Sequence, residues 1–213
     1  MNTCLELRLV KINSVRTLMK DNSIDLFVLG PGTHLRWLLG FSPPQDERPS
    51  MLLIGKEKEI FLIPSVNAED VRRKTDIKIN IWKDDSGPDQ ALKEALLYID
   101  ESSAKHIAID EAMRAHFALI VIDALPNPTH VFTGSTIGAL RMRKDQTEFI
   151  NLKENALIDD RAMKAGFAAI KEGVTELEIG EAINKHFISE GAKPQFCICL
   201  LYTSDAADDT PCV

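Results

Sequence analysis

The feature that most limits the fold of this chain is a short apolar run, IDLFVLG, at residues 24–30. Nearly continuous apolar runs of this length are typical of strands buried on both faces of a sheet. Comparable runs lie at residues 50–55, 59–64 and 106–110, and an alternating apolar and polar run lies at 77–82. These runs predict a sheet inside an α/β layer structure.

Apolar stripes at helical spacing, separated by polar breaks, lie between these runs. They predict helices over about residues 6–20, 33–39, 67–74, 88–101 and 112–125. The polar turn Lys56–Lys58 separates two apolar runs, which is the pattern of a hairpin. A last short strand is expected at residues 130–134. We therefore predict one mixed-sheet α/β domain over residues 1–135.

The sequence becomes almost wholly helical in character after residue 135. A short linking helix is expected at residues 136–141 and a long helix at 146–172. Thr175 and Glu178 have the spacing of a capping box, which predicts the start of another helix that ends at Gly191. Nothing adequate follows for these helices to pack on, so the second unit looks started and not finished.

Charge and composition exclude several classes of function. The 213 residues contain 25 Lys and Arg against 32 Asp and Glu, with no basic stripe, so nucleic acid is not an expected partner. No apolar run reaches the roughly 18–20 residues of a membrane span, and the N-terminus does not read as a signal peptide. Three of the four cysteines lie within the last seventeen residues. A reducing, cytoplasmic location is therefore expected.

Motifs for catalysis or metal binding are weak when the residues are taken alone. Gly30-Pro31-Gly32 follows a strand, but Leu35 stands where a dinucleotide-binding fingerprint needs its third glycine. None of the five histidines has the spacing of a metal-binding motif, and Cys197-Ile198-Cys199 has no second cysteine pair or histidine nearby. We expect most of these residues to be structural.

A loop cluster is the exception. His34, Arg36, Trp37 and, further along, Arg48 combine charged, aromatic and imidazole groups, which together could form a binding surface. The alternative is that Trp37 and Phe41 pack the short helix onto the sheet while the charged groups stay in solvent. Both interpretations remain open for His34 and Arg48, and packing is favoured for Phe41.

Several segments resemble a known family. IDLFVLGPGTHLRWLLGF at residues 24–41, followed by Arg48-Pro49 and IFLIPSVNAED, resembles the N-terminal domain of the creatinase, prolidase and aminopeptidase P group. RMRKDQTE at residues 141–148 resembles the segment that opens the catalytic pita-bread domain of this group. IKEGVTELE at residues 170–178 resembles a later turn of that domain. The resemblance covers about residues 10–198.

The resemblance implies a metallopeptidase that hydrolyses the bond before proline, or a related creatine hydrolase. It also implies a homodimer in which the N-terminal domain of one subunit lends residues to the active site of the other. On that basis His34, Trp37 and Arg48 are predicted to bind substrate across the dimer, with proline-containing peptides as the partners.

The resemblance further implies two divalent metal ions (manganese, cobalt or zinc) in the full-length parent, held by two Asp, one His and two Glu. Those ligands belong to strands that should begin near Phe196, where this chain changes character. We therefore expect no catalytic residue and no metal site in this chain, and we assign no metal role to Asp205, Asp208 or Asp209.

The last residues read differently from the rest. The segment from Cys199 to Asp208 resembles a transposon-type sequencing adapter translated in frame, so residues 199–213 are expected to be a non-native tail. The alternative is a short natural loop.

The resulting hypothesis has three parts. Residues 1–135 form a creatinase/prolidase-like N-terminal domain, residues 136–198 hold the linker and first helices of an incomplete pita-bread α+β domain, and residues 199–213 are the tail. The chain is expected to be an inactive fragment of a prolidase-like or aminopeptidase P-like enzyme. The alternatives are the N-terminal part of a creatinase-like amidinohydrolase, or a stand-alone dimerisation or binding module.

Overall fold

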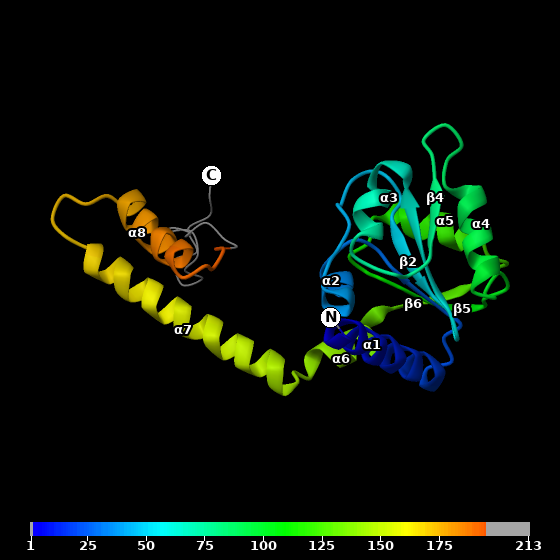
Figure 1. The fold of residues 1–213 in the computed structure, drawn as a ribbon, viewed down its shortest axis with the longest axis horizontal. Helices are drawn as coiled ribbons and strands as arrows, with labels where there is room; N and C mark the ends of the chain where they lie inside the picture. Colours follow the sequence, from blue (N-terminus) through cyan, green and yellow to red (C-terminus); the bar gives the residue numbers. More distant parts are fainter. Residues whose placement is uncertain (1, 195–213) are drawn as a thin grey trace, which may run out of the picture. The chain divides into compact units, whose positions relative to one another are not determined.

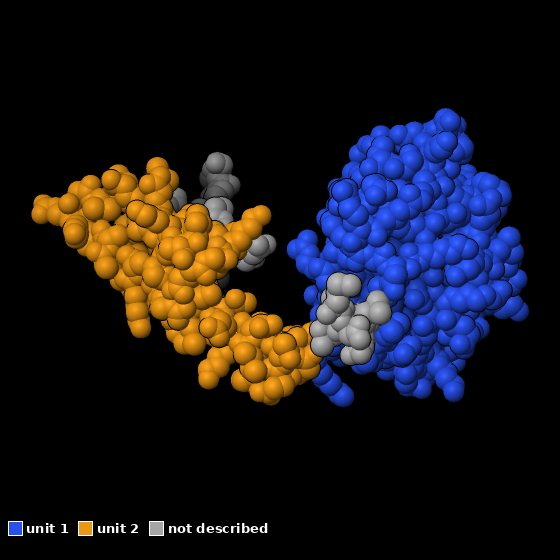
Figure 2. All heavy atoms as spheres, in the orientation of Figure 1, with its two compact units in different colours: residues 1–143 blue, residues 144–213 orange. Residues whose placement is uncertain are grey.

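The structure is a computed structural model that describes residues 2–194, and the expected tail at 199–213 lies outside this range. The chain divides into two compact units, unit 1 at residues 1–143 and unit 2 at residues 144–213 (Figure 2). Within the described residues, no helix has both the length and the apolar character needed to cross a membrane.

Unit 1 is built on a six-stranded mixed sheet with the strand order β4-β3-β2-β1-β5-β6. The strands are β1 (Leu26–Leu29), β2 (Met51–Ile54), β3 (Glu59–Pro64), β4 (Ile79–Trp82), β5 (His106–Ile109) and β6 (Thr129–Phe132). β1, β5 and β6 run parallel, as do β3 and β4, whereas β2 is antiparallel to both of its neighbours. The predicted mixed sheet and its hairpin are confirmed.

Helices cover both faces of the sheet (Figure 1). One face packs against α4 (Asp89–Tyr98) and α5 (Ala115–Asp123). The other packs against α1 (Asn2–Asp21), α2 (Thr33–Leu39), α3 (Ser65–Arg72) and α6 (Ile137–Met142), which follows the short 3-10 helix η1 (Thr133–Ser135). Two apolar cores, one on each face, therefore surround the central strands.

The burial of β1 on both faces of the sheet explains the unbroken apolar run in its sequence. Leu26 and Val28 lie in the core beneath α4 and α5, while Phe27 and Leu29 lie in the opposite core. All four side chains are completely buried, because successive residues of a strand point to opposite faces and both faces are covered. The prediction of a strand buried on both sides is confirmed.

Several helices have other ends than predicted, and the structure gives a physical reason at α5. The helix expected at residues 112–125 begins only at Ala115, because the amides of Ala112 and Met113 bind Asp110 in a turn that ends β5. The first helix carries only part of its apolar stripe into the core. Ile12 and Val15 are fully buried, whereas Val10 is 61% exposed.

Unit 2 contains α7 (Gln146–Ala169) and α8 (Glu176–Ser189) among its described residues. Both begin with a capping box, formed by Asp145 and Glu148 for α7 and by the predicted pair Thr175 and Glu178 for α8. The two helices pack closely at Gly166, where an added Cβ atom would lie 2.6 Å from Cγ1 of Ile183.

Candidate functional site

A group of polar side chains gathers at the carboxyl ends of the parallel strands of unit 1. His34 lies on α2, which follows β1; Asp110 and Glu111 directly follow β5; and Thr133 directly follows β6. Ligand atoms of His34, Asp110 and Glu111 lie within 4.8 Å of one another. Open α/β sheets form their ligand sites at this edge, so the position favours a functional role. We call these four residues the strand-end cluster.

Asp110 is the most buried member of the strand-end cluster, with 2% of the residue exposed. Its Oδ1 accepts a hydrogen bond from the Ala112 amide at 2.9 Å, whereas its buried Oδ2 has no partner of normal hydrogen-bond geometry. Burial raises the pKa of the Asp110 carboxyl, although the amides of Ala112 and Gly30 and the nearby His34 act in the opposite direction. A buried, unpaired carboxylate oxygen is costly unless a positive group or a proton reaches it.

Glu111 is held differently, because Thr133 fixes only one of its oxygens. Oε2 of Glu111 accepts from Oγ1 of Thr133 at 2.5 Å and from the Thr133 amide at 3.2 Å. Oε1 lies 3.6 Å from Nε2 of His34. Burial alone raises the pKa of Glu111, but the bonds from Thr133, together with the Glu111 amide and the nearby His34, outweigh it and the pKa is lowered. Glu111 is therefore an ionised carboxylate with one oxygen turned toward His34.

His34 is 8% exposed and connects the two carboxylates to α6. Nη1 of Arg141 lies 2.9 Å from Nδ1 of His34 and 3.2 Å from Oγ1 of Thr33. A guanidinium can only donate, so Nδ1 is the acceptor and Nε2 carries the imidazole hydrogen. Nε2 in turn lies 3.4 Å from Oγ1 of Thr133.

Trp37 and Arg48, the other predicted substrate-binding residues, have partners outside the strand-end cluster. Nζ of Lys11 lies 4.2 Å from the ring centroid of Trp37 and donates to the Trp37 carbonyl oxygen at 2.9 Å. Arg48 donates to both carboxylate oxygens of Asp84 at 3.0–3.2 Å. The pairing with Asp84 raises the pKa of Arg48. A role for these residues in binding substrate stays a prediction.

The packing interpretation of Phe41 is confirmed. Phe41 is half-buried against the core that lies beneath α1 and α2, with its ring centroid 6.2 Å from that of Phe61.

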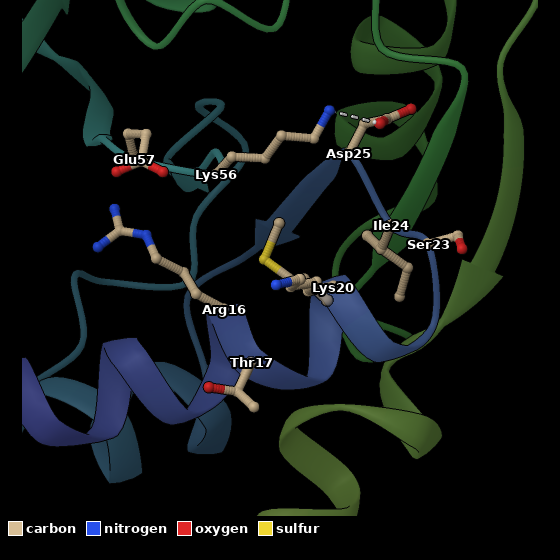
Figure 3. Close-up of a pocket in the computed structure, with 9 residues that line it drawn as sticks. Arg16, Thr17, Lys20, Ser23, Ile24, Asp25, Lys56 and Glu57 are labelled. Carbon is tan, nitrogen blue, oxygen red and sulfur yellow. Dashed lines mark hydrogen bonds and ion pairs between the residues drawn. The ribbon is translucent and has the colours of Figure 1, made fainter.

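A surface pocket of about 590 Å³ lies near the start of β1. Arg16 and Lys20 line it from α1, and Lys56 and Glu57 line it from the β2–β3 turn (Figure 3). Nζ of Lys56 binds Oδ1 of Asp25 at 2.8 Å, as the dashed line in Figure 3 marks. Oδ2 of Asp25 also accepts from two backbone amides at the start of β5. These bonds join β1 to β5 and to the hairpin, which makes a structural role the simpler explanation.

Sequence reasoning missed Asp110, Glu111 and Thr133 as possible site residues. Each comes directly after an apolar strand, and that position is the signal that could have identified them. Recognising it requires knowing that β1, β5 and β6 are parallel neighbours, which the individual strand patterns do not reveal.

The strand-end cluster does not fit the expected two-metal centre. Among the side chains that the structure describes, at residues 7–194, His34, Asp110 and Glu111 are the only group of three metal-ligand residues close enough to share an ion. They provide one His, one Asp and one Glu, whereas the expected centre needs two Asp, one His and two Glu. No step of two-metal hydrolysis is therefore derived from them.

Comparison with known proteins identifies the fold and the relatives. The sequence-family model of the creatinase/prolidase N-terminal domain matches residues 11–143. YkvY of Bacillus subtilis (strain 168) carries the provisional name of a dipeptidase. It is 25% identical to this chain over 171 residues, which cover 79% of this chain and 47% of YkvY. The chain thus spans about half the length of the curated relative it matches.

Solved structures show the same fold. The dipeptidase of Pyrococcus horikoshii OT3 superimposes with a TM-score of 0.74 at 24% identity, over 84% of this chain and 50% of that one. The Xaa-Pro dipeptidase of Bacillus anthracis gives a TM-score of 0.68 at 18% identity, over 86% and 49%. Both alignments extend beyond residues 11–143, since that stretch alone is too short to give such coverage.

Proposed function

The chain belongs to the creatinase/prolidase N-terminal domain family, and from this premise we propose that it provides the N-terminal half of an Xaa-Pro dipeptidase. The observation that carries the proposal is the extent of the structural match. It includes unit 1 and continues into unit 2 in an enzyme that is itself an Xaa-Pro dipeptidase.

The proposed reaction is hydrolysis of the peptide bond before proline. Two divalent metal ions, held by residues other than the strand-end cluster, would activate water and polarise the scissile carbonyl. The contribution proposed for unit 1 is substrate binding at the edge of a partner subunit's site.

Arg48 and Trp37 are the residues proposed to make that contribution. The guanidinium of Arg48 can bind the carboxylate of a dipeptide through two parallel hydrogen bonds, as it now binds Asp84. Trp37 is half-buried with Lys11 over its ring, and its indole is the aromatic side chain proposed to cover the apolar ring of proline. His34 is less accessible, because its imidazole is buried and bound to Arg141.

A domain exchange tests the proposal. Residues 1–143 have a core on each face of their own sheet, so they can replace the N-terminal segment of the B. anthracis enzyme that they match, with the rest of that enzyme kept. The chimera is expected to hydrolyse Ala-Pro in the presence of Mn²⁺ and to leave Ala-Leu intact. The matched control is the B. anthracis enzyme with that N-terminal segment deleted. A folded chimera no more active than this control contradicts the proposal.

A further inference from the structure

We propose that His34, Asp110 and Glu111 bind one divalent transition-metal ion of the zinc, cobalt or manganese class at the carboxyl ends of β1 and β5. The inference does not depend on the proposed peptidase function. The site is separate from the two-metal centre expected in the family, because its ligands all lie in unit 1.

The two carboxylates support the proposal because each has one oxygen held by the protein and one available. The Ala112 amide holds Oδ1 of Asp110, and Thr133 holds Oε2 of Glu111. The remaining oxygens are Oδ2 of Asp110, which has no hydrogen bond of normal geometry although the Gly30 amide acts on this carboxyl, and Oε1 of Glu111, which faces His34. Hydrogen bonds that orient ligand side chains in this way are a regular feature of metal sites.

The distances fit a small ion after a modest contraction. Two ligands about 2.0–2.2 Å from a tetrahedral ion are roughly 3.3–3.6 Å apart. The 3.6 Å between Nε2 of His34 and Oε1 of Glu111 is at the upper end of this range. A carboxylate oxygen of Asp110 lies within 4.8 Å of the ligand atoms of His34 and Glu111, so a side-chain movement of about 1 Å brings it to the same ion. One imidazole and two carboxylates suit zinc, cobalt or manganese better than the all-oxygen sites of calcium.

Metal binding at this site should affect the hydrogen bond between Arg141 and His34. An ion bound at Nε2 of His34 requires the imidazole hydrogen to move to Nδ1, where Arg141 now donates. Arg141 must then turn away from Nδ1, although Oγ1 of Thr33 still offers it a partner. Metal binding therefore competes with the Arg141–His34 hydrogen bond. Removing the guanidinium should strengthen binding, both by freeing Nδ1 and by removing a nearby positive charge.

Calorimetric titration of the full chain with Co²⁺ and with Zn²⁺ tests the proposal. The four cysteines are first replaced by serine, because thiolates bind both ions. One ion per chain is expected, with visible absorption bands for bound Co²⁺. His34→Ala and Glu111→Gln should each weaken binding at least about tenfold, while Arg141→Met should tighten it several-fold.

The matched control is His130→Ala, which removes an exposed imidazole on β6 outside the strand-end cluster and should leave the affinity unchanged. Melting curves without metal confirm that each variant folds. If His34→Ala does not fold, Glu111→Gln decides, because its side chain is 46% exposed and the amide can keep the bond from Thr133. Absence of binding at millimolar metal, or equal affinity in the Glu111 variant, overturns the proposal.

Discussion

Arg141 on α6 donates a hydrogen bond of 2.9 Å to Nδ1 of His34 on α2, 107 residues earlier in the chain. This bond begins a series of hydrogen bonds through the strand-end cluster that all run in one direction. His34 Nε2 points its hydrogen at Oγ1 of Thr133, and Thr133 donates to Glu111. The series begins at a guanidinium, which only donates, and ends at a carboxylate, which only accepts. It therefore joins α6 to the carboxyl edge of the sheet.

Replacing Arg141 with Met should loosen α6. The change removes hydrogen bonds to His34 and Thr33, and the partly exposed site suggests a loss of about 1 kcal/mol in the free energy of unfolding. Urea denaturation measures this loss, and hydrogen exchange should show faster exchange of the α6 amides. Arg143→Met is the matched control, because it removes the same charge at an exposed position nearby. Equal effects of the two changes would exclude a specific role for the Arg141–His34 bond.

The sheet core gives a larger expected effect. Leu53 on β2 is fully buried in the core beneath α4 and α5, so Leu53→Ala removes apolar contacts and leaves a cavity. A loss of about 2–5 kcal/mol in the free energy of unfolding is expected. Leu97 on α4 is 62% exposed, and Leu97→Ala should change stability by less than about 0.5 kcal/mol. Denaturant midpoints of the two variants measure the difference.

The sheet could be predicted from the sequence because each buried strand has its own local apolar pattern. Phe27 and its neighbours are apolar without interruption, and such a run is interpretable without knowing what packs on it. The strand-end cluster could not be predicted in this way. Its members come from three separate segments of the chain, and Arg141, which binds His34, comes from a fourth. Their proximity depends on strand order and on where α6 returns.

The residues at which helices begin were also hard to predict from apolar patterns. Asp110 draws the following residues into a turn, so α5 starts later than its apolar pattern suggests. The pattern of Thr175 and Glu178 succeeded because a capping box is itself a local signal.

Glu101 should make stability depend on pH. Its side chain is 7% exposed, and Oε1 accepts from the Lys56 amide at 3.3 Å. Burial raises its pKa above the ordinary value of 4.5, with the Lys56 amide opposing this. The folded state then binds the proton more tightly than the unfolded state, so this group's contribution to stability is present below pH 4.5 and is lost as the pH rises through the folded pKa.

Glu101→Gln should therefore be more stable than the native protein at pH 7, because a neutral amide can keep the bond to Lys56 without a buried charge. The advantage should shrink as the pH is lowered toward 4. Melting temperatures across this range measure it, with Glu57→Gln as an exposed control in the adjacent turn. An advantage that does not change with pH would contradict the assignment to Glu101 ionisation.

Arg48→Ala in the dipeptidase chimera tests the proposed substrate contact. The functional interpretation predicts a higher KM for Ala-Pro with little change in kcat, because uniform binding is lost. Stability should change little, since the partner Asp84 is 59% exposed and the pair is in contact with solvent. Arg72→Ala is the control, because Arg72 forms a similarly exposed pair with Glu69 on α3. An unchanged KM with a lowered melting temperature would favour a structural role for Arg48.

Replacing Gly166 with alanine should destabilise the protein, although the same change inside a helix usually stabilises. Alanine in place of glycine inside a helix normally stabilises by about 1 kcal/mol. Here a Cβ atom would lie 2.6 Å from Cγ1 and 2.7 Å from Cδ1 of Ile183, so Gly166→Ala should push α7 and α8 apart and destabilise the pair. In an Ile183→Ala background the obstructing atoms are gone, and the same change should be stabilising. Hydrogen exchange of the α7 and α8 amides in the two single variants and the double variant measures this coupling. Destabilisation of equal size in both backgrounds would show that the close approach to Ile183 is not the cause.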